Sequence, residues 1–266
     1  MRECLALVRA AWLTESSYRV NMALSLVSLA LIVVPLYFVS NALQPLMAST
    51  IASQSPEYFA FTLTGALVFA LVSASISALP TALGSAIGRG TLEAFLATPT
   101  RPAVLFAGMS AYTVLWAVVR AAVLLTAGVL LGVHFAWGNA ATSALILAML
   151  IVAYSAIGLV GGALLLLFRT TGPILSGTLT LSAFLGGVYY PTHVVPSWLQ
   201  MISRVIPMTY GLRALRQTAL RGEPFAVVAR DVSLLAGETA ILLLIGWLSI
   251  AAALRYAKRS GTLSQY

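Results

Sequence analysis

Two long stretches without a charged side chain constrain this chain more than any other feature of its sequence. No Asp, Glu, Lys or Arg occurs in residues 20–56 or in residues 58–88. A helix needs about 20 mostly apolar residues to cross a bilayer, so each stretch is long enough to do so. Of the 266 residues, 60% are hydrophobic and 8% are charged, whereas soluble domains carry about 25% charged residues. The sequence therefore predicts an all-α integral membrane protein.

Apolar runs predict six transmembrane helices within a single domain over residues 1–266. Proline at position 35 lies inside the first span and should kink it, because proline lacks a backbone donor. Pro173 suits the first turn of the fifth span. The expected spans lie near residues 20–40, 58–80, 104–131, 140–168, 173–189 and 232–254.

The distribution of Lys and Arg predicts the orientation of the helices. Six spans place both termini on one side, which carries nine of these residues, whereas the short loops on the other side carry none. Because Lys and Arg collect in cytoplasmic loops, both termini are expected to be cytoplasmic. The long segment 190–231 holds five arginines on the outer side, where the rule is weaker. The nine are Arg2, Arg9, Arg19, Arg89, Arg101, Arg169, Arg255, Lys258 and Arg259, and the five are Arg204, Arg213, Arg216, Arg221 and Arg230.

Few residues offer catalytic or metal-binding chemistry. The only lysine, Lys258, does not follow a glycine-rich loop, so the chain has no Walker A motif for nucleotide phosphates. Cys4 is the only cysteine, and His134 and His193 lack acidic or cysteine neighbours. We therefore expect no catalytic residue and no metal site. The net charge of +8 is attributed to membrane topology, so no nucleic-acid partner is expected.

Charges within the spans are rare. Glu238 is expected within two turns of the outer end of the last span, so no proton relay is predicted near a span centre. Arg120 lies inside the third span, where an arginine costs about 2.5–3.5 kcal/mol on insertion scales. Such a residue faces either a partner inside the bundle or a watery path, and both alternatives stay open.

A short charged segment, GRGTLEAFLATPTRP at residues 88–102, separates the second and third spans. Leu92, Phe95 and Leu96 share one helical face, and Glu93 suits the helix dipole in the first turn. Prolines end the helix within about two turns. Its apolar face either docks a partner or folds back on the bilayer surface.

A second interrupted segment, at residues 190–224, separates the fifth and sixth spans. Its two apolar stripes are too short to span a bilayer, and Trp198 and Tyr210 suit an interfacial position. We therefore expect a pair of short helices in the outer leaflet, with Arg213 and Arg216 facing away from the second stripe. The stripes are Trp198, Ile202, Val205 and Ile206, and Leu212, Leu215 and Ala219.

Together these segments resemble the membrane subunit of ATP-binding-cassette exporters of the type-2 permease family. Ile206 departs from the family pattern, which usually has Asn there. The first segment matches at Gly90, Thr91, Leu92, Glu93, Leu96, Thr98 and Pro99. The second matches at Tyr190, Pro191, Pro196, Ser197, Trp198, Leu199, Pro207, Met208, Thr209, Tyr210, Leu215 and Arg216.

The resemblance implies a mechanism. Residues 86–102 would form a coupling helix seated in a separate ATPase, with Phe95 as its apolar knob, and residues 1–19 an amphipathic connecting helix on the cytoplasmic face. Residues 190–224 would be outer re-entrant helices. Two ATPase subunits, which bind ATP and Mg, would drive two permease chains, identical or related. This chain itself would bind no cofactor.

The resemblance also implies a bacterial or archaeal cytoplasmic membrane and an amphipathic substrate, such as a drug-like compound, a lipid or a lipid-linked glycan. The fifth helix, with the first or second, would line the path, and Arg120, Leu181, Phe184 and Leu185 are its candidates. The three apolar residues fit plain packing equally well. Small residues such as Gly158 and Gly162 allow close helix contact, here expected within the subunit. An ATP-independent channel or lipid scramblase is the alternative function.

Overall fold

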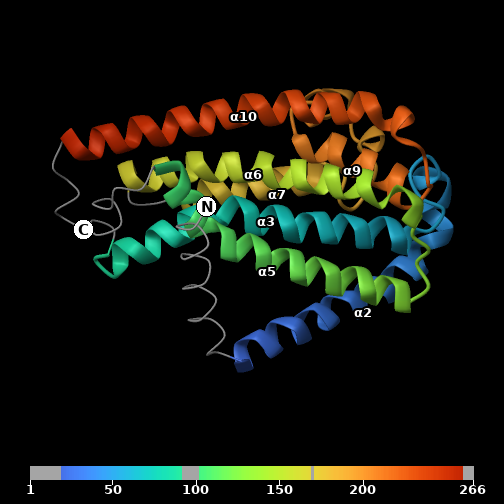
Figure 1. Ribbon diagram of the computed structural model, residues 1–266. Coiled ribbons are helices and arrows are strands. Elements are labelled where there is room, and N and C mark those ends of the chain that lie inside the picture. Colours follow the sequence, from blue (N-terminus) through green and yellow to red (C-terminus); the bar gives the residue numbers. More distant parts are fainter. Residues whose placement is uncertain (1–18, 92–101, 169–170, 260–266) are drawn as a thin grey trace.

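The computed structural model describes residues 19–91, 102–168 and 171–259. Its long helices lie side by side along one direction, and α2 diverges from the others at its N-terminal end (Figure 1). Five helices in the described residues are long and apolar enough to cross a membrane. They are α2 (Arg19–Ile51), α3 (Tyr58–Gly88), α5 (Pro102–Leu130), α6 (Ala140–Phe168) and α10 (Phe225–Arg259).

The fifth predicted span corresponds to α7 (Gly172–Leu185), which has only 14 residues. At 1.5 Å per residue α7 is about 21 Å long, shorter than the roughly 30 Å hydrocarbon core. Pro173 lies in its first turn, as predicted. The helix ends before Tyr189, the predicted end of the span, because Gly187, at φ +87°, turns the chain.

Short elements gather at one end of the bundle. They are η1 (Trp137–Asn139), η2 (Thr192–Val194), α8 (Ser197–Ser203) and α9 (Pro207–Ala219). With the loops 52–57, 131–136, 186–191 and 220–224 they form what we call the α9 end, whereas α3 and α6 finish at the opposite end (Figure 1). The predicted pair of short helices at residues 190–224 corresponds to α8 and α9.

The helix α3 is the centre of the bundle. In its most apolar window 78% of residues are buried, against 18–39% for the other four spans. An added Cβ on Gly158 of α6 would lie 2.8 Å from the Ile76 carbonyl of α3, and one on Gly162 would meet Leu79 and Leu83. The expected close helix contact within the subunit is therefore confirmed.

Several helices are longer than their apolar runs. Helix α2 continues through Pro45 to Ile51, and α3 continues through Pro80 to Gly88. Helix α10 begins at Phe225, so Glu238 lies thirteen residues inside it, about 20 Å from its start. The prediction that Glu238 lies within two turns of the helix end is wrong, because the helix starts before the run that predicted it.

Candidate functional site

The first two residues of the motif at residues 90–99 terminate helix α3. Gly90 has φ +66°, its N–H donates to the Ile87 carbonyl at 3.0 Å, and the Thr91 N–H donates to the Ala86 carbonyl at 2.9 Å. This pair of bonds is a Schellman motif, which favours glycine at the left-handed position. Gly90 and Thr91 therefore stop the helix and lead into the predicted coupling segment.

The rest of that segment lies outside the described residues. This applies to Leu92, Glu93, Phe95, Leu96, Thr98 and Pro99, and to residues 1–18 of the connecting helix predicted at residues 1–19. The docking role of these residues stays a prediction.

At the α9 end, Arg216 is 1% exposed and uses all five of its N–H donors. Its Nε donates to Thr64 Oγ1 at 3.2 Å. Its two other nitrogens donate to Gln54 Oε1, at 3.2 Å, and to the carbonyls of Gly187, Phe61 and Val188, at 2.8, 2.9 and 3.1 Å. The guanidinium carbon also lies 3.4 Å from the centre of the Phe61 ring.

This network joins four segments: the loop after α2, the first turns of α3, the turn after α7, and α9. Burial lowers the pKa of Arg216 to about 9, so the side chain is charged at neutral pH. The prediction that Arg216 faces away from the apolar stripe is wrong. Backbone carbonyls left free by the turn at Gly187 supply the partners that make its burial stable.

Arg213, in contrast, lies at the edge of α9. It donates to both carboxylate oxygens of Asp231 on α10, at 2.6 and 2.5 Å. This hydrogen-bonded carboxylate raises the pKa of Arg213. The guanidinium also lies 5.5 Å from the centre of the Tyr210 ring. The pair therefore fixes α9 against the first turns of α10.

Further polar contacts hold the loops of the α9 end. The Tyr58 hydroxyl donates to the Tyr189 carbonyl at 3.0 Å. Asn139 Nδ2 donates to the carbonyl of Gly222 at 2.8 Å, and Arg221 donates to the carbonyl of Ser53 at 2.8 Å. Each bond joins parts of the chain far apart in sequence, so the α9 end is one connected unit.

The remaining residues of the outer signature differ in their surroundings. Pro196 precedes α8, and Pro207 lies in the first turn of α9. Ile206 is the N-cap of α9 and its side chain makes no capping bond, consistent with its departure from the family's Asn. Trp198 is 64% exposed, and Pro191 is buried.

The path candidates do not all share one face. On α7 Leu181 is 59% exposed and Phe184 is 50% exposed, whereas Leu185 is buried. Arg120 is partly buried near the middle of α5, and its Nε has no hydrogen-bond partner among the described residues. The structure therefore brings Leu181 and Phe184 together on one surface, apart from Leu185.

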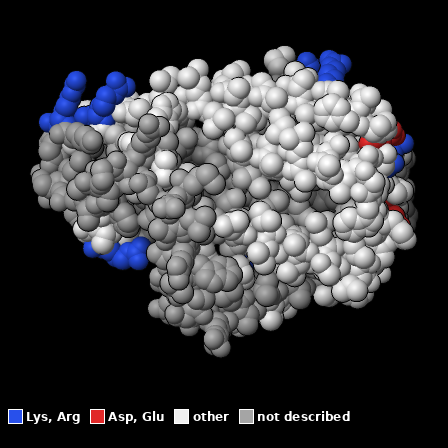
Figure 2. Space-filling model, in the orientation of Figure 1, with Lys and Arg blue, Asp and Glu red and all other residues white. Residues whose placement is uncertain are grey.

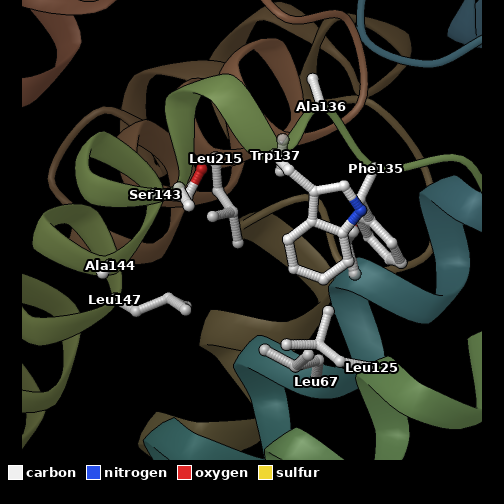
Figure 3. A pocket seen from close by; sticks show the side chains of 12 residues that line it. Leu67, Leu125, Phe135, Ala136, Trp137, Ser143, Ala144, Leu147 and Leu215 are labelled. Atoms are coloured by element: carbon white, nitrogen blue, oxygen red, sulfur yellow. The ribbon is translucent and has the colours of Figure 1, made fainter. Parts of the chain in front are cut away.

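Two apolar pockets lie between the helices. One, of about 180 Å³, lies under Trp137 and is lined by Leu67, Leu125, Leu147 and Leu215 (Figure 3). A larger one, of about 550 Å³, is lined by side chains of α3, α5, α6 and α10. Both suit hydrocarbon rather than a polar solute.

Charged side chains of the described residues occur toward the two ends of the molecule in Figure 2, and the white atoms visible between them belong to uncharged residues. That distribution fits a bilayer around the middle of the helices. Within it, Glu238 Oε2 is buried without a hydrogen-bond partner among the described residues. Those residues also hold no group of three His, Cys, Asp or Glu side chains placed for a metal ion.

A family model described as ABC-2 type transporter matches residues 3–220. The chain belongs to the ABC-2 type transporter family. A comparison with curated proteins finds no match.

Membership makes this chain a multi-pass membrane component of an ABC transporter. Members of this family are generally not catalytic and do not bind a cofactor themselves; in ABC transporters an ATPase is their partner. The matched range includes α9 and ends before α10. The motif residues that carried the resemblance to type-2 permeases, from Gly90 to Pro99 and from Tyr190 to Arg216, therefore lie inside it.

Proposed function

We propose that this chain is the transmembrane subunit of an ATP-driven exporter and forms half of the path for an amphipathic substrate. The family match over residues 3–220 is the observation that carries the proposal. We expect a drug-like compound, a lipid or a lipid-linked glycan, because the spans offer few charges that could hold a strongly ionic solute. In the described part of the chain, the charged residues of the spans are Arg120, Glu238 and, near the two ends of α10, Arg230, Asp231 and Arg255.

The segment after α3 is the proposed docking site for the ATPase. Gly90 and Thr91 end α3 through two backbone hydrogen bonds, so a force on the next residues acts directly on the most buried span. An apolar knob such as Phe95 suits this role, since a packed contact transmits displacement, whereas an exposed ion pair is weak and screened.

A second permease chain is proposed because two helices leave wide apolar faces uncovered. Only 18% of the α2 window is buried, and Ile174, Leu181 and Phe184 of α7 are each at least half exposed. These three residues fall on one side of α7, at i, i+7 and i+10. The partner chain is either an identical copy or a related one.

The proposed orientation places the α9 end outside and both termini in the cytoplasm of a bacterium or archaeon. Arg89, Arg255 and Arg259 lie at the opposite end, where cytoplasmic cations are expected. The coupling segment then faces the compartment that holds ATP.

Copurification tests this function. The chain is purified in mild detergent from its own host, and mass spectrometry should find an ATPase in comparable amount. The variant Phe95→Asp should lose that ATPase, whereas Ala94→Asp, which places the same charge on the opposite helical face, should keep it. Equal ATPase recovery with both variants contradicts the docking site. A chain without ATPase that moves lipid or solute in vesicles contradicts the exporter and favours the channel or scramblase.

A further inference from the structure

A polar pocket of about 570 Å³ lies between α8, α9 and the start of α10. It differs from the other two large pockets because charged and hydrogen-bonding groups line most of it. Its lining residues are Thr192, His193, Gln200, Ser203, Arg204, Thr209, Tyr210, Arg213, Arg230, Asp231 and Leu234. We call it the arginine pocket.

The charges of the arginine pocket do not balance. Asp231 is its one acidic lining residue, and Arg213 already holds both carboxylate oxygens. Arg204 and Arg230 are exposed, and among the described residues no side-chain hydrogen bond or ion pair engages either guanidinium. Two guanidinium groups are therefore left for an anion, and such groups match phosphate oxygens in geometry.

The helix that forms one wall of the pocket also has an apolar outer face. Gln200, Ser203 and Arg204, in and just after α8, line the pocket. On the other side Trp198, at 64%, and Met201, at 69%, are exposed. A ligand with a charged group in the pocket can therefore lay hydrocarbon along α8.

We propose that the arginine pocket binds the phosphate group of an anionic amphiphile from the outer leaflet. This assignment shares with the proposed function only the placement of the α9 end at the outer membrane surface. A free phosphate ester offers the same anion without hydrocarbon, and the probes below separate these two sources. The binding needs no ATPase, so its failure differs from a failure of the exporter function.

Direct binding to the purified full chain in neutral detergent tests this assignment. The probes are dioctanoyl phosphatidylglycerol, dioctanoylglycerol, which lacks the phosphate, and glycerol 3-phosphate, which lacks the chains. The double variant R204Q/R230Q should bind phosphatidylglycerol about twenty-fivefold more weakly than the native chain, roughly fivefold for each arginine. The matched control R255Q/R259Q removes the same charge at the opposite end and should bind normally.

Phosphatidylglycerol should bind the native chain at least about tenfold more tightly than either other probe. Its affinity should also fall with added salt, because the ionic contact is near the surface, and this measurement needs no variant. Equal binding to native chain and R204Q/R230Q overturns the site. Equal binding of dioctanoylglycerol overturns the phosphate contact, and equal binding of glycerol 3-phosphate assigns the pocket to a soluble anion instead.

Discussion

Replacement of Arg216 by methionine should destabilise the α9 end more than any other single arginine change there. The variant removes five hydrogen bonds and leaves the turn carbonyls of Gly187 and Val188 without this donor. Each buried carbonyl without a partner costs about 1–3 kcal/mol. Because a buried cation no longer has to be desolvated, part of that cost is offset, and we expect a net loss of about 3–5 kcal/mol.

Thermal unfolding of the detergent-solubilised chain, followed by tryptophan fluorescence, measures this loss. For a chain of this size the expected decrease in Tm for Arg216→Met is on the order of 10 °C. Arg216→Lys should fall between native and Met, since an ammonium group has three donors and no planar fork. The control Arg221→Met removes one bond at an exposed position and should change Tm little. Equal decreases for Arg216→Met and Arg221→Met refute the reasoning.

Two further predictions concern packing and orientation. Gly158→Ala should lower Tm, because the added methyl group forces α6 away from the α3 backbone at a cost of about 1–3 kcal/mol. The control Gly84→Ala should be neutral or stabilising, because its Cβ would lie 3.7 Å from its nearest neighbour. Equal effects of the two variants on Tm would contradict the close helix contact. In a Cys4→Ser background, Gly138→Cys at the α9 end should react with a membrane-impermeant maleimide in intact cells, and Gly88→Cys only after lysis. Neither glycine has a neighbour within 4 Å of an added Cβ, and the opposite labelling pattern would reverse the orientation.

Apolar runs predicted the long helices well where charged or turn-forming residues flank the run on both sides. The fourth predicted span, 140–168, coincides with α6. The fifth did not, because apolar composition continues through Val188 although Gly187 already turns the chain. Val188 is buried at the α9 end, and hydropathy alone does not separate a lipid-facing helix from a turn buried in protein.

The spacing of the sequence indicates that Arg216 lies on the buried face of α9, although the prediction placed it on the opposite face. Position 216 is four residues after Leu212, so the two lie on the same helical face, and only the charge of arginine suggested otherwise. Arg213, one residue after Leu212, lies off the stripe and is partly exposed, as expected. The carbonyl acceptors of Arg216 come from segments up to 155 residues away, which no local pattern predicts.

Three of the five arginines in the segment 190–231 are explained by their partners rather than by membrane topology. Arg216 binds carbonyls, Arg213 binds Asp231 and Arg221 binds the Ser53 carbonyl, so three hold the α9 end together. The other two, Arg204 and Arg230, line one pocket. A long segment is also translocated largely regardless of its charge. These cations are therefore compatible with an outer α9 end. The nine Lys and Arg residues on the other side remain the sequence feature that predicts the orientation.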